Sequence, residues 1–378
     1  MESHASTKTK TVCLLLGVVA VLGLRLYLAY RYYGNFDQQS YEIVANIVRR
    51  GGNVYAETLR YNYTMIWAYV LTFLMNISDA VHLPFHFVVR GFGTLVDIAD
   101  ALFIGLICRR IGSRSLWSGM AIYLVNPITL GLGGFHGQFE NFAILPLLAA
   151  THVYLRRPEP RSLKWVWLLG TLALLIKHNV VFGIWMLFVY AARRARVSAL
   201  MMAASCVLFF MAFIPYWTEG RAGIIQNVFL YRSGSGLQGL GCLLPNSASA
   251  PIFLCLMGLM PFLARYYLRL PLAKAMELSF VALLALIYGM GKQYFLMPII
   301  WGGFFTTGWY WLYTAVTALF MLGWTHRLGS LQMLPANWNL VWFPTMAWLL
   351  SYFLVWKVDI RQLLPSLLMA AKKGKEAA

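Results

Sequence analysis

Acidic residues are scarce in this chain. Asp and Glu together number 13 among 378 residues, and charged residues of both signs make up only 12% of the sequence. Soluble domains carry roughly 25% charged residues, and no polar stretch here is long enough to build one. Hydrophobic residues account for 60%, and several apolar runs reach the roughly 18 to 20 residues that one membrane crossing requires. The composition therefore predicts a single all-α integral-membrane domain over residues 1–378.

Cysteine spacings typical of disulfides or metal sites are also missing from the sequence. We interpret the five cysteines as small apolar residues: Cys13, Cys108, Cys206, Cys255 and, alone in a predicted loop, Cys242. The first apolar run, residues 12–29, lacks a small-residue cleavage site, so we expect a retained helix and not a cleaved signal peptide. We see no internal repeat, which weakens the hypothesis of an inverted-repeat transporter.

Basic residues are abundant by contrast, and they give a net charge of +18. They cluster at the ends of apolar runs, at residues 109–110, 156–157, 193–196 and 372–375. Such clusters are typical of the cytoplasmic loops of membrane proteins and contact anionic lipid headgroups, so we expect membrane lipids and no nucleic acid as partners. Lys8 and Lys10 precede the first run, which predicts a cytoplasmic N-terminus and an outer position for Asp37.

Charge parity predicts an apolar segment that lies on the membrane surface. Residues 63–77 and 92–108 both fall between Asp37, expected outside, and Arg109, expected inside, so only one of them can cross fully. Residues 63–77 have polar ends and many Tyr and Trp side chains, which favour the interface. Residues 40–50 have apolar side chains at helical spacing and are a second candidate for a membrane-lying helix.

The apolar runs together predict about ten to thirteen transmembrane helices. Crossing segments are expected at residues 12–29, 92–108, 116–132, 139–155, 163–176, 180–190, 199–216, 252–267, 272–290, 309–324 and 341–356, with a shorter run at 295–305. A Gly-rich outer loop is expected from Trp217 to about Ser249, and loops of this length are often functional.

Most of the unusual polar residues fall at the outer ends of these predicted helices. Polar groups at membrane depth are costly and usually serve a site. The set is Asp37, Arg60, His136, Gln138, Glu140, Lys177, His178, Arg232, Lys292 and Gln293. One carboxylate among several cations suits a general base beside a group that gains negative charge, such as a phosphate-bearing lipid.

Simpler interpretations of these residues stay open. Asp37 can be a water-exposed helix end, and Glu140 can favour a helix N-terminus after an ordinary loop. Lys177 and His178 can anchor a short helix at the membrane interface.

Further charges lie inside the predicted helix over residues 92–108 or close to its start. Arg90 and Asp97 are seven residues apart on one helical face, and we favour a structural role for them over catalysis. Asp100 follows Asp97 by three residues and can help to satisfy the same buried face.

Four stretches, in order along the chain, carry a resemblance to a known family. They are Phe36-Asp37-Gln38-Gln39-Ser40-Tyr41; Gly52-Asn53-Val54-Tyr55 with Thr58, Arg60-Tyr61-Asn62-Tyr63 and Trp67; Asn126-Pro127 with His136-Gly137-Gln138-Phe139-Glu140-Asn141; and Lys177 with Lys292-Gln293-Tyr294-Phe295-Leu296. In their order and placement the chain resembles the GT-C superfamily of integral-membrane glycosyltransferases, most of all its polyprenyl- and dolichyl-phosphate-mannose-dependent mannosyltransferases. Thr64 and Met65 stand where prolines are common in the family.

The resemblance implies a fold and a reaction. Residues 1–217 correspond to the family's membrane module, whose first outer loop, residues 32–89, carries two membrane-lying helices, and residues 218–378 form an outer loop and variable helices. The implied reaction is the inverting transfer of a sugar, mannose before others, from a polyprenyl- or dolichyl-phosphate sugar donor to a lipid-linked or glycan acceptor. It takes place on the outer face of a bacterial or archaeal plasma membrane, or on the lumenal face of the endoplasmic reticulum.

The resemblance also implies roles for single residues. Asp37 is the expected catalytic base. The residues expected to bind the donor or the acceptor are Arg60, Tyr61, His136, Gln138, Glu140, Lys177, His178, Arg232, Lys292, Gln293 and Tyr294. Many relatives carry paired acidic residues in the first loop, whereas Gln38 follows Asp37 here. We therefore expect no cofactor and assign no metal ligands; a divalent metal stays an open alternative that no paired acidic motif supports. The alternative hypothesis is a lipid or polysaccharide carrier, such as a flippase, without catalysis.

Overall fold

The structure is a computed structural model that describes residues 2–158, 160–192, 194–231, 234–235, 239–324 and 340–354. The described chain is helical almost throughout. Strands β1 (Gly234–Ser235) and β2 (Gly289–Met290) form one short antiparallel pair, in which Gly234 faces Met290. The all-α class predicted from composition is therefore confirmed for the described residues.

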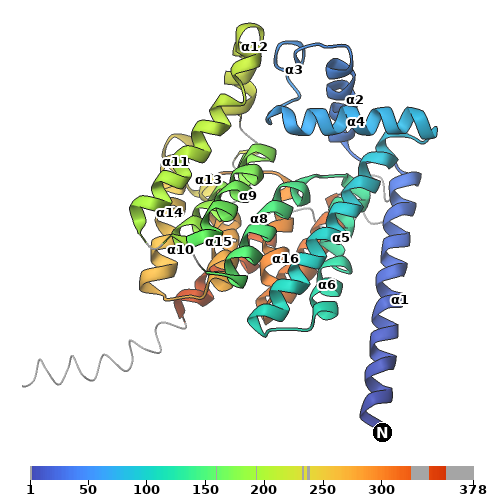
Figure 1. Cartoon of the computed structure of the whole chain (residues 1–378), viewed down its shortest axis with the longest axis vertical. Coiled ribbons are helices and arrows are strands. Elements are labelled where there is room, and N and C mark those ends of the chain that lie inside the picture. Colours follow the sequence, from blue (N-terminus) through green and yellow to red (C-terminus); the bar gives the residue numbers. More distant parts are fainter. Residues whose placement is uncertain are drawn as a thin grey trace, which may run out of the picture.

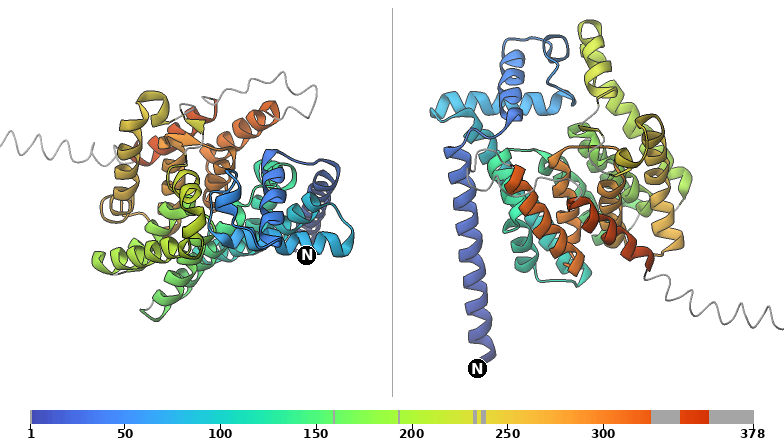
Figure 2. Two further views of the ribbon diagram at one scale, coloured as in Figure 1. Left: turned by 90° about the horizontal axis from the view of Figure 1, so that it is seen from above. Right: turned by 180° about the vertical axis from the view of Figure 1, so that it is seen from behind.

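The N-terminal helices form one side of a helix bundle and a cap over one of its ends. They are α1 (Glu2–Arg31), α2 (Phe36–Arg49), α3 (Val54–Glu57), α4 (Met65–Val81) and α5 (Phe85–Ile111). Figure 1 and Figure 2 show α1 standing at one side of the bundle and α4 lying across the ends of α1 and α5. Because α2 packs on α4, these two helices together form the cap.

The side chains of α4 explain its crosswise position. The helix buries Trp67 and Leu71 and exposes Tyr69 and Phe73 on its other face. The Trp67 ring stacks on Phe139 with centroids 4.2 Å apart, which holds the cap against the bundle. The position agrees with the surface helix predicted for residues 63–77, whose placement in a membrane stays a prediction.

The middle helices form the core of the bundle. They are α6 (Leu116–Leu124), α7 (Pro127–Thr129), η1 (Leu130–His136), α8 (Glu140–Arg156), η2 (Pro160–Ser162), α9 (Leu163–Ile176), η3 (His178–Val180) and α10 (Val181–Ala191). α8 packs against both α5 and α9, and its Asn141 side chain ties it to α5 by donating to the Gly93 carbonyl at 2.8 Å.

The apolar run over residues 116–132, predicted as a crossing segment, is bent. The axes of Leu116–Leu124 and Pro127–His136 differ by 51°. Pro127 lacks the N–H that would continue the helix, and the Asn126 side chain caps the new helix by accepting from the Ile128 N–H at 2.9 Å. The bend brings His136 and the turn after it to the underside of the cap.

The C-terminal helices complete the bundle. They are α11 (Ala195–Met211), η4 (Ile214–Tyr216), α12 (Trp217–Gly223), η5 (Ile224–Phe229), α13 (Leu240–Leu243), α14 (Asn246–Phe262), η6 (Leu263–Tyr267), α15 (Leu272–Leu286), η7 (Lys292–Phe295), α16 (Leu296–Gly302), α17 (Gly308–Trp324) and a helix over Leu340–Leu354. The bounds of α9 match the predicted segment 163–176, and most other helices overlap their predicted runs.

The Gly-rich loop predicted for residues 217–249 is wrong over much of its length. The helical run Ala195–Phe229 continues through the start of that region. A Cβ on Gly223 would stand 1.8 Å from the carbonyl oxygen of Tyr55, and Asn53 donates from its side chain to the Tyr216 carbonyl at 3.2 Å. The glycine therefore permits close packing of α12 on α3, which supports helix where composition alone indicated a loop.

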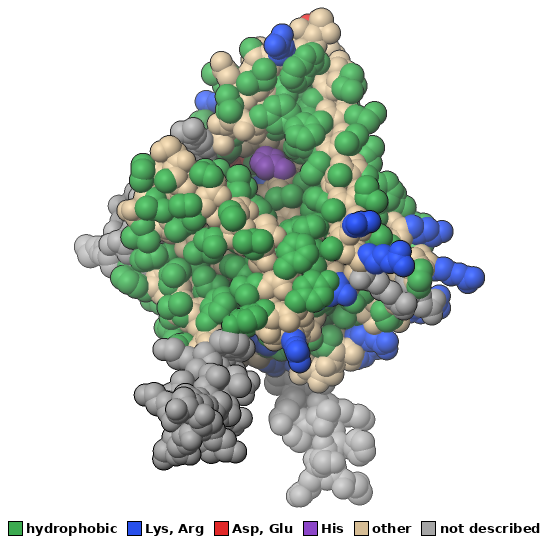
Figure 3. Space-filling model, turned by 90° about the vertical axis from the view of Figure 1, so that its left-hand side faces the viewer, with side chains coloured by type: hydrophobic (Ala, Val, Ile, Leu, Met, Phe, Trp, Pro, Cys, Tyr) green, Lys and Arg blue, Asp and Glu red, His purple; other side chains and the backbone are tan. Residues whose placement is uncertain are grey.

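Three described helical segments are long and apolar enough to cross a membrane: Phe85–Ile111, Ala195–Phe229 and Ser247–Tyr267. The bent pair Leu116–Leu124 and Pro127–His136 makes a fourth when it is counted as one span. Figure 3 shows hydrophobic side chains over most of one face, with most of the Lys and Arg side chains at its right and lower right. These features indicate a membrane protein, whereas the count of about ten to thirteen spans stays a prediction.

Two of the basic clusters meet at the end of the bundle that lies away from the cap. Arg110 Nε donates to the Leu155 carbonyl at 3.1 Å, so the end of α5 contacts the end of α8. Arg109, Arg110, Arg156 and Arg157 are all exposed there. The basic end and the Asp37 end are therefore opposite one another, in agreement with the inner and outer sides expected from charge.

Candidate functional site

A cavity of about 370 Å³ opens beside the first turn of α2. Its lining comes from α2, the loop before α4, the turn before α8, and two segments near the C-terminal helices. The lining residues are Phe36, Asp37, Ser40, Tyr41, Leu59, Arg60, Asn62, Tyr63, Gln138, Tyr231, Gly291 and Gln293. Four residues of the predicted site are thus brought together here: Asp37, Arg60, Gln138 and Gln293.

Asp37 is held at the N-terminus of α2, where a negative charge is favourable. Asn35 caps the helix by accepting from the Asp37 N–H at 3.1 Å, and its Nδ2 donates to Asp37 Oδ2 at 2.9 Å. Gln138 Nε2 donates to the same oxygen at 2.5 Å. Among the described residues no hydrogen bond reaches Oδ1, so the half-buried carboxylate keeps one oxygen for the cavity.

The turn that carries Gln138 is shaped by a glycine. Gly137 has φ +68, and a Cβ there would stand 2.2 Å from Gln38 Nε2. Gln38 is buried and donates to the Gly137 carbonyl at 3.1 Å. His136, one residue earlier, is buried against Phe135 with ring centroids 5.3 Å apart, so it supports the turn and does not line the cavity.

Glu140 and Lys177 form a buried ion pair. Lys177 Nζ lies 2.5 Å from Glu140 Oε1, and both side chains are almost fully enclosed. The ammonium also lies over the rings of Phe139 and Tyr63, at 4.0 and 4.8 Å from their centroids. Tyr63 lines the cavity and Lys177 does not, so the ion pair lies behind the cavity wall.

Three other predicted residues also lie outside the cavity wall. Tyr61 is buried, donates to the Thr64 carbonyl and accepts from the Ala68 N–H, which fixes the turn before α4. His178 packs near Tyr63 with ring centroids 6.3 Å apart. Tyr294 is a partly buried residue packed against the hydrophobic core.

The cations that do reach the cavity region lie on two sides of it. Arg60 is exposed, donates to Gln39 Oε1 at 2.8 Å and lies 4.2 Å from the centroid of the Phe36 ring. Lys292 is half-buried and lies between Gly291 and Gln293, which both line the cavity. Burial lowers the pKa of Lys292 to about 8, against an opposing effect of the Asp37 charge. Arg232, the third expected cation, lies outside the described residues.

Several lining residues were not among the predicted site residues. Tyr41, Tyr63 and Tyr231 give the cavity an aromatic wall. Tyr41 and Tyr63 belong to the stretches quoted from the sequence, so their aromatic character next to Asp37 was the signal that could have found them. Tyr231 directly precedes the expected cation Arg232, but nothing in its own neighbourhood marks it.

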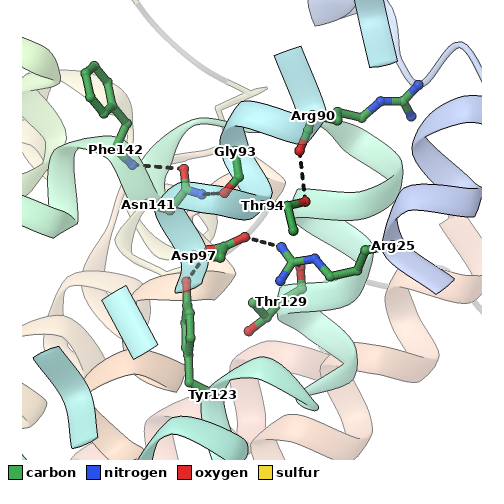
Figure 4. Close-up of polar contacts among 9 residues, drawn as sticks. All are labelled: Arg25, Arg90, Gly93, Thr94, Asp97, Tyr123, Thr129, Asn141 and Phe142. Carbon is green, nitrogen blue, oxygen red and sulfur yellow. Dashed lines mark hydrogen bonds and ion pairs between the residues drawn. The ribbon is translucent and has the colours of Figure 1, made fainter. Parts of the chain in front are cut away.

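A second polar network lies deeper, between α1, α5 and α6, as Figure 4 shows. Arg25 pairs with Asp97 and donates to the Thr129 carbonyl at 3.4 Å. Tyr123 donates its hydroxyl to the other Asp97 oxygen at 2.5 Å. Asp100 is buried one turn further along α5. The pairing of Asp97 with α1 and α6 supports the structural role favoured from sequence.

Arg90, on the same helix, has different partners from Asp97. Its guanidinium donates to the carbonyls of Ala29 at 2.6 Å and Phe135 at 3.0 Å, and also to that of Tyr32. It therefore joins the end of α1 to η1, in the second half of the bent pair. Among the described residues, no three His, Cys, Asp or Glu side chains come together as a metal site; metal dependence stays a matter for experiment.

No protein-family model, curated protein or solved structure matches this chain. The resemblance drawn from the four sequence stretches therefore stays a prediction, and the function has to be argued from the cavity itself.

Proposed function

We propose that the protein is an integral-membrane, inverting glycosyltransferase of the GT-C type. It moves a sugar, mannose before others, from a polyprenyl- or dolichyl-phosphate sugar to a lipid-linked or glycan acceptor. The observation that carries the proposal is the cavity beside α2, where Asp37 presents a carboxylate among aromatic and amide side chains. Its volume of about 370 Å³ falls in the range of sites that enclose small ligands, roughly 300 to 1,000 Å³.

The proposed reaction is a single displacement. The acceptor hydroxyl oxygen attacks the anomeric carbon, and Asp37 takes the hydroxyl proton through its carboxylate. The bond from the anomeric carbon to the phosphate oxygen breaks, and the lipid phosphate leaves with the electron pair. One displacement inverts the configuration at the anomeric carbon, so no covalent sugar–enzyme intermediate is needed.

The charges around the cavity suit the departing phosphate. Negative charge builds on the phosphate as the bond breaks, so a cation there stabilises the transition state more than the ground state. Arg60 lines the cavity, and Lys292 lies between the lining residues Gly291 and Gln293, close enough for the Asp37 charge to act on it. Arg232 is the third cation proposed to bind the donor phosphate, from its place in the sequence alone. Tyr41, Tyr63 and Tyr231 line the cavity and place aromatic side chains next to a bound sugar.

The proposal places the reaction on the outer or lumenal side of the membrane. The cavity lies at the cap end, and the exposed arginines of α5 and α8 lie at the other end, which the positive-inside bias assigns to the cytoplasm. A plasma membrane of a bacterium or archaeon, or the endoplasmic reticulum, would provide such a side. The exposed apolar surface of the long helices suits a prenyl chain as well as bulk lipid.

The direct test is sugar transfer by the purified protein in lipid nanodiscs. Labelled polyprenyl-phosphate sugars are offered with a panel of lipid and glycan acceptors, and Asp37→Asn serves as the matched control. We expect labelled product from the wild type and none from the variant. Equal transfer by both proteins, or no transfer with any donor, would reject the proposal.

A lipid or polysaccharide carrier is the second candidate, because two ion pairs are buried among apolar helices. Arg25–Asp97 and Glu140–Lys177 both lie out of contact with water, and charges at membrane depth often mark transport pathways. Reconstitution in liposomes with a fluorescent polyprenyl phosphate separates the two functions. A carrier moves the lipid across the bilayer equally well with Asp37→Asn, whereas the proposed enzyme moves none.

A further inference from the structure

Two neighbouring glutamines connect α2 to the turn before α8 in opposite directions. Gln138, in the turn, donates to Asp37 Oδ2 at 2.5 Å. Gln38, the residue after Asp37, donates back to the Gly137 carbonyl at 3.1 Å. Each segment thus donates one side-chain hydrogen bond to the other. One of the two bonds ends on Asp37 itself, and the other starts from the residue next to it. We call this pair of contacts the glutamine clasp.

The clasp fits tightly because glycines stand on both sides of Gln38. Gly34 has φ +96 and Gly137 has φ +68, conformations that side-chain-bearing residues rarely adopt. A Cβ on Gly34 would approach Gln38 Cγ to 2.9 Å, and a Cβ on Gly137 would clash with the side-chain amide of Gln38. Arg90 packs beside both glycines, since a Cβ on Gly34 would stand 3.5 Å from Arg90 Nη1 and one on Gly137 would stand 3.0 Å from Arg90 Cγ. Its guanidinium donates to the carbonyls of Ala29 in α1 and Phe135 in η1.

The clasp leaves Asp37 with one oxygen occupied and one available. Asn35 and Gln138 both donate to Oδ2, and among the described residues nothing donates to Oδ1. A general base needs its accepting oxygen within roughly 2.6 to 3.2 Å of the hydroxyl. Two donors on the same oxygen fix the rotation of the carboxylate, and so fix where the other oxygen points.

We propose that Gln138 is a positioning residue for Asp37 and not a ligand-binding residue, and that Gln38 holds Gln138 in place through the backbone of Gly137. This inference rests on the proposed glycosyltransferase function. Its physical content is that the clasp contributes to the rate of the chemical step and not to donor affinity. A displacement of about 1 Å at a reacting group can cost on the order of 100-fold in rate.

The test compares Gln138→Leu, Gln38→Leu and the double variant with wild type. Leucine removes the amide donor and keeps similar volume. Asn46→Leu is the matched control, because Asn46 lies on the exposed face of the same helix, away from the cavity. Turnover number and KM for a labelled polyprenyl-phosphate mannose are measured in nanodiscs, together with the melting temperature of each protein.

We expect Gln138→Leu to lower kcat by about 10- to 100-fold with KM and melting temperature close to wild type. Gln38→Leu should lower kcat in the same way but less, and the double variant should lose less than the product of the two losses, because the two residues act as one unit. The control should behave as wild type. A rise in KM at unchanged kcat would assign Gln138 to ligand binding and overturn the proposal, as would unchanged kinetics. Absence of transfer by the wild type rejects the parent function, and the positioning role with it.

Discussion

Two aspartates of this protein sit in opposite physical situations. Asp97, in α5, is enclosed by apolar helices, and its two oxygens are taken by Arg25 and Tyr123. Asp37, at the start of α2, is half-buried, and its described partners all reach one oxygen. The first carboxylate has its charge neutralised inside the fold, and the second faces a cavity with cations at its rim.

The difference lies in how many carboxylate oxygens have a partner. A carboxylate with both oxygens bonded inside the fold is structural, whereas one with an oxygen left for a cavity is a candidate for chemistry. A buried carboxylate without a cation is strongly disfavoured, so Asp97 has to be paired for the bundle to form. Asp37 is stabilised by a helix N-terminus and two neutral amides, which leave its lone pairs accessible. The predictions below probe these two kinds of site against each other.

The largest effect is expected at the cavity. Asp37→Asn keeps the size of the side chain and removes its basicity, so transfer should fall by about 10²- to 10⁴-fold, the usual contribution of a general base. The melting temperature should stay near that of wild type, because asparagine has the same size and can keep contacts with Asn35 and Gln138. Near-normal turnover would show that another group accepts the proton.

Asp97→Asn should give the reverse pattern. The substitution leaves the buried Arg25 guanidinium without its anion, and breaking a buried pair typically costs about 3 to 5 kcal/mol of stability. Thermal unfolding in detergent measures the loss, and transfer per folded molecule should be little changed. Combining Asp97→Asn with Arg25→Met should recover part of the stability. A fully stable single variant with poor transfer would make Asp97 functional instead.

Lys177→Met tests whether the Glu140–Lys177 pair is structural, like Arg25–Asp97, or takes part in the cavity, like Asp37. Because Lys177 lies out of the cavity and on Glu140, we expect a stability loss of similar size, about 3 to 5 kcal/mol. Adding Glu140→Gln should restore part of it. The KM for the donor should change little, and a rise of tenfold or more would mean that the lysine contacts the phosphate after all.

A smaller effect is expected at the cavity cation Lys292. Burial lowers the pKa of Lys292 to about 8, so its ammonium is mostly charged at pH 7 and mostly neutral at pH 9. The KM for the phosphate-bearing donor should therefore rise between these values, and Lys292→Gln should lower turnover by at least about tenfold, the equivalent of one charge-assisted hydrogen bond. Lys292→Arg, which stays charged, should flatten the pH dependence. A wild-type KM that is flat across this range would place the phosphate elsewhere.

The smallest perturbation tests the position of the cap. On a cysteine-free background, single cysteines at Asn62 and Asp79 mark the two ends of the segment that contains α4. Both should react with an impermeant thiol reagent from the outer side only. Asp79 pairs with Arg49 at a solvent-exposed contact, and such pairs contribute little to stability, so the substitution should be tolerated. Labelling of position 79 from the cytoplasm would mean that α4 crosses the membrane.

Much of the helical framework could be predicted from the sequence, because apolar runs of fixed length form helices whatever their partners. The α9 bounds coincide with the predicted segment 163–176. The bend at Asn126-Pro127 was missed because hydropathy does not register a missing N–H, although the proline itself was visible. The helix through residue 217 was missed because its support comes from α3, a contact between distant parts of the chain.

The candidate site could be predicted only in part for the same reason. The positions of the basic clusters and the lengths of the apolar runs predicted that polar residues gather at the outer ends of the helices. Four of these residues share one cavity: Asp37, Arg60, Gln138 and Gln293. Which of them face the cavity depends on packing between segments far apart in sequence. Lys177 turned out to face Glu140, and Gln38, quoted only as a neighbour of Asp37, turned out to hold the turn that carries Gln138.

The stereochemistry of the transferred sugar tests the central claim most directly. A donor of known anomeric configuration is incubated with the purified wild-type protein and an accepted acceptor, and the new glycosidic linkage is assigned by NMR coupling constants. With Asp37 as the base of a single displacement, the product carries the inverted configuration and is absent when Asp37→Asn is used. A product with retained configuration is incompatible with a single in-line displacement and would contradict the account.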